Sequence, residues 1–204
     1  MSIDRFRKQP ILGILRDITQ EQIPPLFETI ISSGLKSVEI TMNTQDAPAL
    51  IKQAVRLSKG KLMIGAGTVV DMKLLKSALS AGASFIVMPV LVKDVVRYCV
   101  KNKIPVFPGA LSPQEIYQAW EAGATMVKVF PAGFFGPKYF REIKGPFKDV
   151  ELLACGGVTA ENMPEYFLNG ASAIAFGASV FRKEWLISKD FSKIEEAIRK
   201  FIGK

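Results

Sequence analysis

Histidine is absent from this chain of 204 residues, and its absence narrows the chemistry available to the protein. Histidine is the commonest general base and a preferred ligand of zinc. Any catalysis must therefore use carboxylates, lysine, hydroxyl groups, the backbone or a hard cation bound by carboxylates. The sequence disfavours an enolate stabilised by zinc, and no metal site is predicted.

Cysteine is almost as scarce. Cys99 and Cys155 are the two cysteines, and they lie far apart without a Cys-x-x-Cys pair. This spacing gives neither a disulfide framework nor a zinc site.

Long apolar runs and clustered charges are also missing. No segment approaches the roughly 18 apolar residues of a membrane span, and Met1–Pro10 is polar with mixed charge, unlike a secretory signal. The net charge of +8 is spread over predicted helices, as at Lys52 and Arg56, and forms no nucleic-acid-binding patch. We therefore expect a cytoplasmic protein without membrane or nucleic-acid partners, whose positive field suits an anionic small molecule.

What the chain does contain is a regular alternation of short apolar segments with amphipathic segments, the pattern of a parallel sheet with connecting helices. The predicted strands are Ile11–Arg16, Ser37–Thr41, Leu62–Thr68, Phe85–Pro89, Pro105–Gly109, Met126–Pro131, Glu151–Gly157 and Ala173–Ser179. The predicted helices are Glu21–Ser33, Ala47–Ser58, Met72–Ala81, Val92–Lys101, Pro113–Ala122, Pro137–Ile143, Glu161–Leu168 and Phe191–Ile202. Eight such units predict an α/β fold, a single-domain (β/α)8 TIM barrel over residues 1–204.

Two further observations bear on the fold. Four predicted helices, every second one, are followed by a glycine that suits a left-handed cap, at Gly34, Gly82, Gly123 and Gly170. The alternative fold, a doubly wound open sheet, typically has a glycine-rich turn after the first strand. This chain has only Gly13 in that region. The barrel is favoured, and its active site would lie at the C-terminal ends of the strands.

Lys128 is the most informative residue. It lies in the buried-strand pattern Met126–Pro131, where Val127 and Val129 point one way and Lys128 the other. A lysine there loses hydration, which favours the neutral, nucleophilic amine that can form a Schiff base. The alternative is a structural lysine that pairs with a carboxylate or extends to the strand end.

Glu39 is predicted to face this lysine. In the second strand Val38 and Ile40 point toward the helices, so Glu39 points inward. The second and sixth strands of an eight-stranded barrel lie on opposite sides, so Glu39 and Lys128 share the central space. An amine and a proton-transferring carboxylate are the minimum machinery of Schiff-base chemistry, although a structural salt bridge is the alternative.

Other strand ends carry candidate binding residues. Arg16 could bind a carboxylate or phosphate through two hydrogen bonds, and Thr68 offers a hydroxyl. Pro89 and Phe130 could pack beside the Lys128 amine. The last two strands end in small residues, Gly156-Gly157 and Gly177 with Ser179 nearby. Their backbone N–H groups could cradle an anion, helped by the helix that follows, at a place where TIM barrels frequently bind phosphate.

These segments together resemble the 2-keto-3-deoxy-6-phosphogluconate aldolase / 4-hydroxy-2-oxoglutarate aldolase family. The resemblance covers nearly the whole chain from Gly13 onward. It rests on the order and spacing of Val38–Thr41, Gly65–Val69, Pro108-Gly109, Val127–Ala132, Lys144–Phe147 and Gly156–Val158.

The resemblance implies a metal-independent class I aldolase without a cofactor, typically a homotrimer. It would reversibly cleave 2-keto-3-deoxy-6-phosphogluconate to pyruvate and glyceraldehyde 3-phosphate, and also 4-hydroxy-2-oxoglutarate to pyruvate and glyoxylate. By position, Lys128 would form the Schiff base and Glu39 would transfer protons. The implied substrate-binding residues are Thr68, Pro89 and Phe130 at the pyruvyl group and Gly156, Gly157, Gly177 and Ser179 at the phosphate.

Departures from the family pattern leave the sugar open. Asn43 stands where gluconate-type members carry arginine, and Cys155 stands where they carry threonine. Asn43 and Arg16 look more like the galactonate-type branch, in which Arg16 could take over the carboxylate contact, whereas Thr41 looks gluconate-type. Two alternatives from other classes are a phosphate-binding barrel isomerase or epimerase and a catalytically silent phosphometabolite-binding protein.

Overall fold

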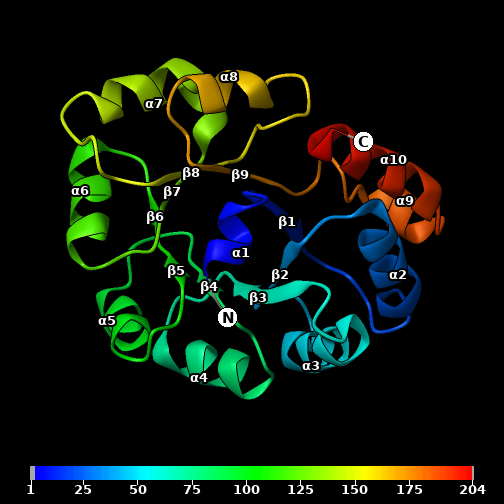
Figure 1. Ribbon diagram of the computed structural model, residues 1–204. Coiled ribbons are helices and arrows are strands. Elements are labelled where there is room, and N and C mark those ends of the chain that lie inside the picture. Colours follow the sequence, from blue (N-terminus) through cyan, green and yellow to red (C-terminus); the bar gives the residue numbers. More distant parts are fainter. Residues whose placement is uncertain (1–2, 204) are drawn as a thin grey trace.

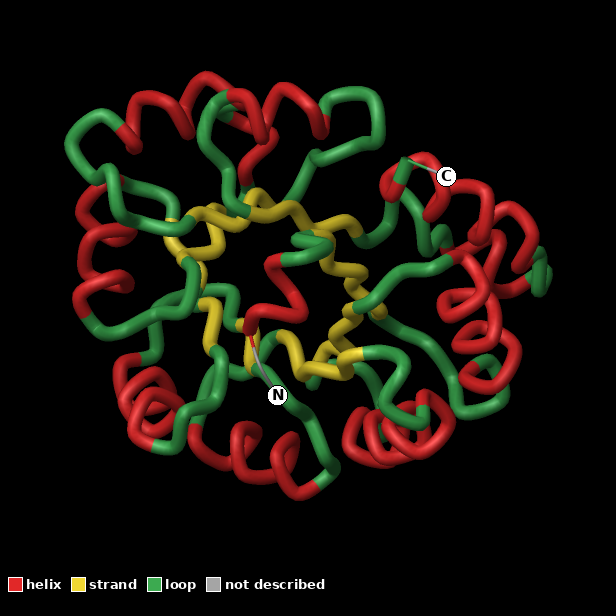
Figure 2. The backbone as a smooth tube through the Cα atoms, viewed as in Figure 1, coloured by secondary structure: helices red, strands yellow, loops and turns green. Residues whose placement is uncertain are grey.

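Nine parallel strands form a nearly closed ring with helices around it (Figures 1 and 2). The computed structural model describes residues 3–203, so Met1, Ser2 and Lys204, the ends of the predicted domain, lie outside the described residues. The strands are β1 (Ile11–Leu15), β2 (Ser37–Thr41), β3 (Met63–Gly67), β4 (Ile86–Val87), β5 (Val106–Phe107), β6 (Gly109–Ala110), β7 (Val127–Val129), β8 (Leu152–Cys155) and β9 (Ala173–Phe176).

The strand order explains how the ring closes. It runs β5-β4-β3-β2-β1-β9-β8-β7-β6, and every pairing is parallel. Its two ends, β5 and β6, are consecutive pieces of one chain segment interrupted at Pro108. The predicted barrel is therefore confirmed, but the predicted strand Pro105–Gly109 is divided in two, because proline has no N–H to continue the ladder.

Helices cover the outside of the ring. They are α2 (Ile23–Ser33), α3 (Ala47–Ser58), α4 (Met72–Ser80), α5 (Lys93–Lys101), α6 (Pro113–Glu121), α7 (Pro137–Lys144), α8 (Met163–Leu168), α9 (Lys183–Ile187) and α10 (Phe191–Ile202), with a 3-10 turn η1 (Ala132–Phe134) after β7. Gly34, Gly82, Gly123 and Gly170 all have φ between 93° and 99°, so the predicted left-handed caps are confirmed. Within the described residues, no helix combines the length and the apolar character that crossing a bilayer requires.

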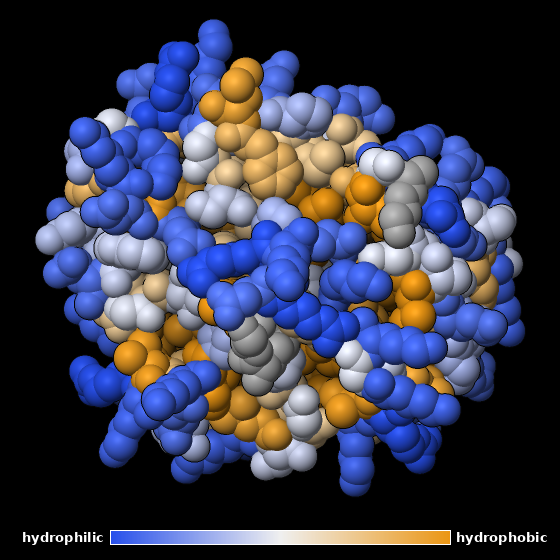
Figure 3. All heavy atoms as spheres, in the orientation of Figure 1, coloured by the Kyte–Doolittle hydropathy of each residue, from blue (hydrophilic) through white to orange (hydrophobic). Residues whose placement is uncertain are grey.

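An unpredicted helix, α1 (Ile3–Arg7), lies across the centre of the ring in the view of Figures 1 and 2. Its Phe6 is buried against Phe107, with ring centroids 5.7 Å apart. Arg5 donates a hydrogen bond to the carbonyl of Gly60, and Arg7 pairs with Glu151 at 2.6 Å, so the helix is tied to segments that precede two different strands. Figure 3 shows the same face covered largely by hydrophilic side chains. This N-terminal end of the barrel is therefore closed.

The apolar core has two layers that follow the strand alternation. Val38 and Ile40 of β2 and Val127 and Val129 of β7 pack in the layer between sheet and helices. The inner layer fills the barrel with residues such as Phe6, Leu12, Met63, Phe85, Phe107, Met126, Leu153 and Cys155. Because Phe6 and inner residues at the strand starts, such as Leu12 and Met63, fill the closed end, polar inward residues near the C-terminal strand ends face the remaining open end.

Candidate active site

Lys128 points into the barrel from β7, as the alternation predicts. Its backbone N–H donates to the carbonyl of Pro108 at 2.8 Å, and its flanking valines belong to the outer layer. The side chain is 8% exposed, and Nζ lies 5.1 Å from the centroid of the Phe130 ring. The amine is therefore partly desolvated and walled by an aromatic ring on one side.

Glu39 points into the same space from β2 and is 1% exposed. In the strand order, β1, β9 and β8 separate β2 from β7, so the two strands are on opposite walls. Burial raises the pKa of Glu39 above its ordinary value, while the nearby charges of Lys128 and Arg16 oppose that rise. Glu39 forms no ion pair within residues 3–203, and its Oε2 has no hydrogen-bond partner there. A buried carboxyl with a free oxygen is available to a bound molecule.

A glycine makes room for this carboxyl. A Cβ added to Gly67 of β3 would lie 2.3 Å from Oε1 of Glu39, far inside any real contact. Gly67 must therefore be glycine for a steric reason, because the missing side chain leaves the space that the Glu39 carboxyl occupies. The sequence alone did not give this reason.

Cys155 also belongs to the site, although the sequence interpretation treated it only as a departure from the family pattern. It ends β8 on the inner face and is 3% exposed. Burial is the largest influence and raises the pKa of its thiol, while the charge of Lys128 and a hydrogen bond with Lys128 oppose this. The signal was present in the alternation, because Leu153 and Cys155 share a face of their strand.

Arg16 follows β1 and is exposed, and its charge reaches both Glu39 and Cys155. Asn43, in the loop after β2, is exposed as well. The turn after Arg16 is fixed by a residue that the sequence interpretation missed: the Asp17 N–H donates to Oγ1 of Thr44 at 3.1 Å.

Thr44 in turn ties this turn to the end of β2. Its Oγ1 lies 2.9 Å from Oγ1 of Thr41, and the Thr44 N–H donates to the Thr41 carbonyl at 2.9 Å. Both threonines are buried. Asp17 has φ of 52°, so its backbone is in the left-handed region that a side chain disfavours and neighbouring contacts must hold. The segments that follow β1 and β2 are thus joined by hydrogen bonds, and Arg16 lies in the first of them.

Two of the three predicted pyruvyl-pocket residues line the same cavity. Pro89 and Phe130 line one cavity of about 340 Å³ together with Val90 and Leu111. Thr68 follows β3 with φ of 57° and is half-buried, but it does not line that cavity.

The glycines after β8 and β9 form a cradle of backbone groups. Gly156 and Gly157 have φ of 88° and 79°, and the Gly133 N–H donates to the Gly156 carbonyl at 2.8 Å. Ser179 Oγ donates to the carbonyl of Val158 at 3.5 Å, which links the two loops. Among residues 3–203, no partner is recorded for the backbone N–H groups of Gly157, Ala178 and Ser179.

The helices after these loops differ from the prediction. The predicted helix Glu161–Leu168 begins only at Met163, and α9 is a short helix that begins at Lys183. An anion at this corner would therefore meet loop N–H groups and not the start of a long helix. The part of the chain that the structure describes contains no group of three His, Cys, Asp or Glu side chains suited to a metal ion.

Comparison with known proteins places this geometry in one family. The family model "KDPG and KHG aldolase" matches residues 3–197. The chain is 32% identical to the 2-dehydro-3-deoxy-6-phosphogalactonate aldolase of Escherichia coli, with 86% of each chain covered. It is 31% identical to the 2-dehydro-3-deoxy-phosphogluconate aldolase of Pseudomonas aeruginosa, with 97% of this chain and 90% of the relative covered.

A solved structure adds the chemistry of one relative. The KDPG aldolase of Legionella pneumophila, with pyruvate captured at low pH as a covalent carbinolamine intermediate, superimposes with a TM-score of 0.88 at 26% identity, covering 95% of this chain and 94% of the other. The relatives named here are aldolases, that is, carbon–carbon lyases. The matched family model spans nearly all of the described barrel, so this chain belongs to the KDPG and KHG aldolase family of enzymes.

Proposed function

We propose that this protein is a class I aldolase that cleaves a 2-keto-3-deoxy-6-phospho sugar acid through a Schiff base on Lys128. The observation that carries the proposal is the placement of two buried groups, Lys128 and Glu39, on opposite inner walls near the open end of the barrel. The covalent carbinolamine of the Legionella pneumophila relative supports the same chemistry.

The first step is attack by the neutral amine. Nζ of Lys128 adds to the C2 carbonyl of the substrate and gives a carbinolamine, and loss of water then gives a protonated imine. The imine withdraws electrons from C3, so the protein needs no metal to stabilise the carbanion. We therefore propose metal-independent catalysis, with activity unchanged by a chelator.

The second step is cleavage. The Glu39 carboxylate takes the proton of the C4 hydroxyl, the C3–C4 bond breaks, and its electrons pass into the imine to form an enamine. The aldehyde, glyceraldehyde 3-phosphate, leaves. Glu39 then returns a proton to C3, and hydrolysis of the imine releases pyruvate and frees Lys128. Burial serves this role because a raised pKa makes the Glu39 carboxylate a stronger base.

Two binding regions would orient the substrate. Arg16 suits the carboxylate beside the imine, because Asn43 supplies no charge there and Arg16 already acts on the barrel interior. The cradle of Gly156, Gly157, Gly177 and Ser179 suits the phosphate, because the backbone N–H groups of Gly157, Ala178 and Ser179 have no partner among residues 3–203.

Reduction with borohydride in the presence of pyruvate tests the Schiff base. We expect one reduced pyruvyl adduct per chain, mapped to Lys128 by peptide mass spectrometry, because reduction makes the imine permanent. Protein that stays unmodified under these conditions would eliminate the mechanism and would favour the isomerase or the silent binding protein.

Substrate preference needs a separate measurement. Relatives named for the galactonate and the gluconate substrates are 32% and 31% identical to this chain, so identity does not choose between the two C4 epimers. We propose the gluconate epimer as the main substrate, with the galactonate epimer and 4-hydroxy-2-oxoglutarate as the alternatives. Pyruvate release from the three compounds, measured under identical conditions, decides this, and a higher kcat/KM with either alternative would replace the assignment.

Thr44 gives a prediction about Arg16. Thr44→Val removes the hydroxyl that accepts the Asp17 N–H, and we expect the free energy of unfolding to fall by about 1–3 kcal/mol because the part-buried Asp17 N–H and the buried Thr41 hydroxyl both lose a partner. We also expect KM for pyruvate in the condensation direction to rise several-fold with a smaller change in kcat. Thr44→Ser, which keeps the hydroxyl, should restore KM, and an unchanged KM in the valine variant would separate Thr44 from substrate binding.

We also propose a homotrimer. Phe134 and Phe135, in and after η1, are 85% and 57% exposed next to the site residue Phe130, and neighbouring exposed aromatic side chains often mark protein–protein interfaces. Sedimentation equilibrium of the wild-type protein and of Phe134→Asp tests this, with a shift of the variant toward monomer as the expected result. A wild-type monomer would refute the proposal.

A further inference from the structure

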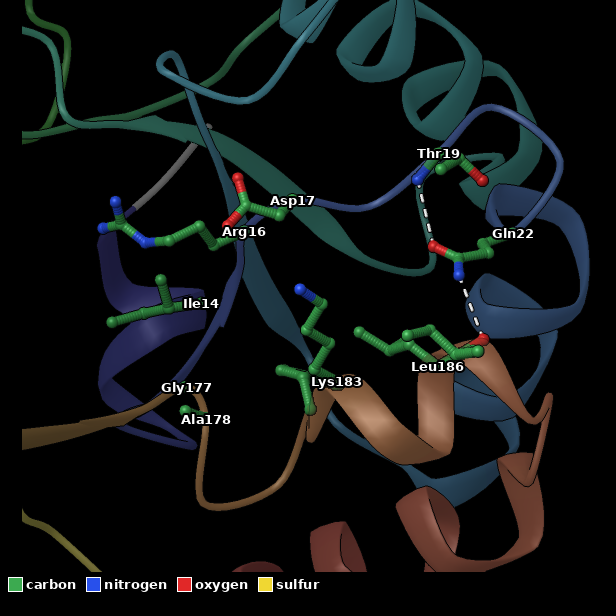
Figure 4. A pocket seen from close by; sticks show the side chains of 11 residues that line it. Ile14, Arg16, Asp17, Thr19, Gln22, Gly177, Ala178, Lys183 and Leu186 are labelled. Carbon is green, nitrogen blue, oxygen red and sulfur yellow. Dashed lines mark hydrogen bonds between the residues drawn. The ribbon is translucent and has the colours of Figure 1, made fainter.

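A second cavity lies beside the catalytic space, between the loop after β1 and the short helix α9. Its volume is about 280 Å³. Figure 4 shows its lining, which comes from β1 and the following loop on one side and from the β9 loop and α9 on the other. Arg16 and Gly177 line this cavity and also belong to the proposed substrate site, so the two spaces are neighbours.

One glutamine joins the two walls of the cavity. The Thr19 N–H donates to Oε1 of Gln22 at 3.0 Å, and Nε2 of Gln22 donates to the carbonyl of Leu186 at 3.0 Å (Figure 4). The oxygen and the nitrogen of the Gln22 amide therefore both form hydrogen bonds within the cavity wall. The remaining lining is mainly apolar, with Ile14, Phe181, Leu186 and Ile187. Such a wall is built to hold an apolar body.

The charges around the cavity are unpaired. Lys183, the first residue of α9, is exposed and reaches into the space between Asp17 and Leu186 in Figure 4, whereas Arg16 runs to the opposite side. None of Arg16, Asp17 and Lys183 forms an ion pair with any residue in the described range.

The neighbouring cation behaves differently. Arg182 lies 3.8 Å from a carboxylate oxygen of Glu184, and its guanidinium lies 4.7 Å from the centroid of the Trp185 ring. Arg182 therefore contacts residues of α9, whereas the neighbouring Lys183 is available to a ligand in the cavity.

We propose that this cavity binds a small carboxylate with a short apolar body. The carboxylate meets the Lys183 ammonium, and the body packs against Ile14, Phe181 and Leu186. Three charges, two positive and one negative, face an apolar wall, and this arrangement suits an anion better than a neutral or cationic ligand. The site adjoins the glycine cradle for the phosphate, with which it shares Gly177, and it requires no covalent chemistry at Lys128.

Direct binding of 4-methylpentanoate tests the proposal. This acid has no ketone, so it cannot form an imine, and its binding is distinguishable from the Schiff-base reaction of pyruvate. We expect calorimetry on the full chain to give a Kd on the order of 1 mM, the range for a ligand of so few atoms. Methyl NMR signals of Ile14, Leu186 and Ile187 should shift, while those of Leu91 and Leu111 in the other cavity stay in place.

Charge and position are tested with one analogue and three variants. The neutral 4-methylpentanamide should bind more weakly than the acid. Lys183→Ala should weaken binding roughly threefold to fivefold, as expected for one exposed charge pair. Ile187→Asp, at a side chain that is 67% exposed and so unimportant for folding, should weaken binding further by placing a negative charge at the cavity. Lys138→Ala, at an exposed lysine on α7, should leave binding unchanged.

The proposal is overturned if no methyl group of the cavity responds to the acid, if the amide binds as well as the acid, or if Lys183→Ala binds like the wild type. A borohydride adduct at Lys128 alongside any of these results would leave the proposed aldolase function standing.

Discussion

Replacing Lys128 with methionine is expected to abolish aldolase activity, lowering kcat/KM by roughly 10⁴-fold or more, because the variant has no amine to form the imine. Methionine keeps the length of the side chain, and its neighbour Met126 shows that the inner layer accepts this residue type. Pyruvate release coupled to lactate formation measures the activity. No pyruvyl adduct should appear on Lys128→Met after borohydride reduction.

The control for this variant is its stability. Lys128 is 8% exposed, so an apolar side chain of similar length should leave the protein folded, with a melting temperature close to that of the wild type. A matched lysine variant is Lys138→Ala, whose side chain is exposed on α7, and its activity should be that of the wild type. A Lys128→Met protein that remains folded and active would show that another group carries the reaction.

The central pair could be predicted because it depends only on strand alternation and barrel topology. Val127 and Val129 on one face place Lys128 on the other, and the same reasoning places Glu39 inside. Parallel strands at opposite positions of a ring must then face each other across its centre. The roles of these two residues stay predictions, but their placement follows from pattern and topology.

What the sequence did not show depends on short or irregular segments. Helix α1 has a single buried residue, Phe6, and a segment of that length carries no helical period to detect. The break at Pro108 occurs within a segment that reads as one strand. Thr44 acts through a turn that brings it to Asp17, and such turn geometry has no periodic signature in the sequence.

Glu39→Gln is the second variant with a large expected effect. We expect kcat to fall by roughly 10²–10⁴-fold, because the amide fills the space above Gly67 but cannot accept the C4 hydroxyl proton. Borohydride should still give an adduct at Lys128, since attack by the amine does not require cleavage. A variant that loses both adduct and activity would assign Glu39 an earlier step, and one that keeps full kcat would remove Glu39 from proton transfer.

The same variant makes a prediction about stability that runs opposite to its effect on activity. Burial raises the pKa of Glu39 in the folded protein above its ordinary 4.5, so the folded state binds the proton more tightly than the unfolded state does. The penalty for ionising this carboxyl is absent below pH of about 4.5 and grows as pH rises through the folded pKa. Glu39→Gln should therefore be more stable than the wild type at neutral pH, with the difference shrinking toward pH 4.5.

Urea denaturation of both proteins across this pH range measures the difference in free energy of unfolding. A constant difference at every pH would mean that Glu39 does not change its ionisation on folding. A difference that grows with pH would show that the ionised Glu39 carboxyl lowers the free energy of unfolding. The proposed reaction explains why the protein keeps this residue, because a base of raised pKa must accept a hydroxyl proton there. In the Lys128→Met protein the opposing positive charge is lost, so the pKa of Glu39 should rise further, and the penalty at neutral pH should be larger while its onset stays near pH 4.5.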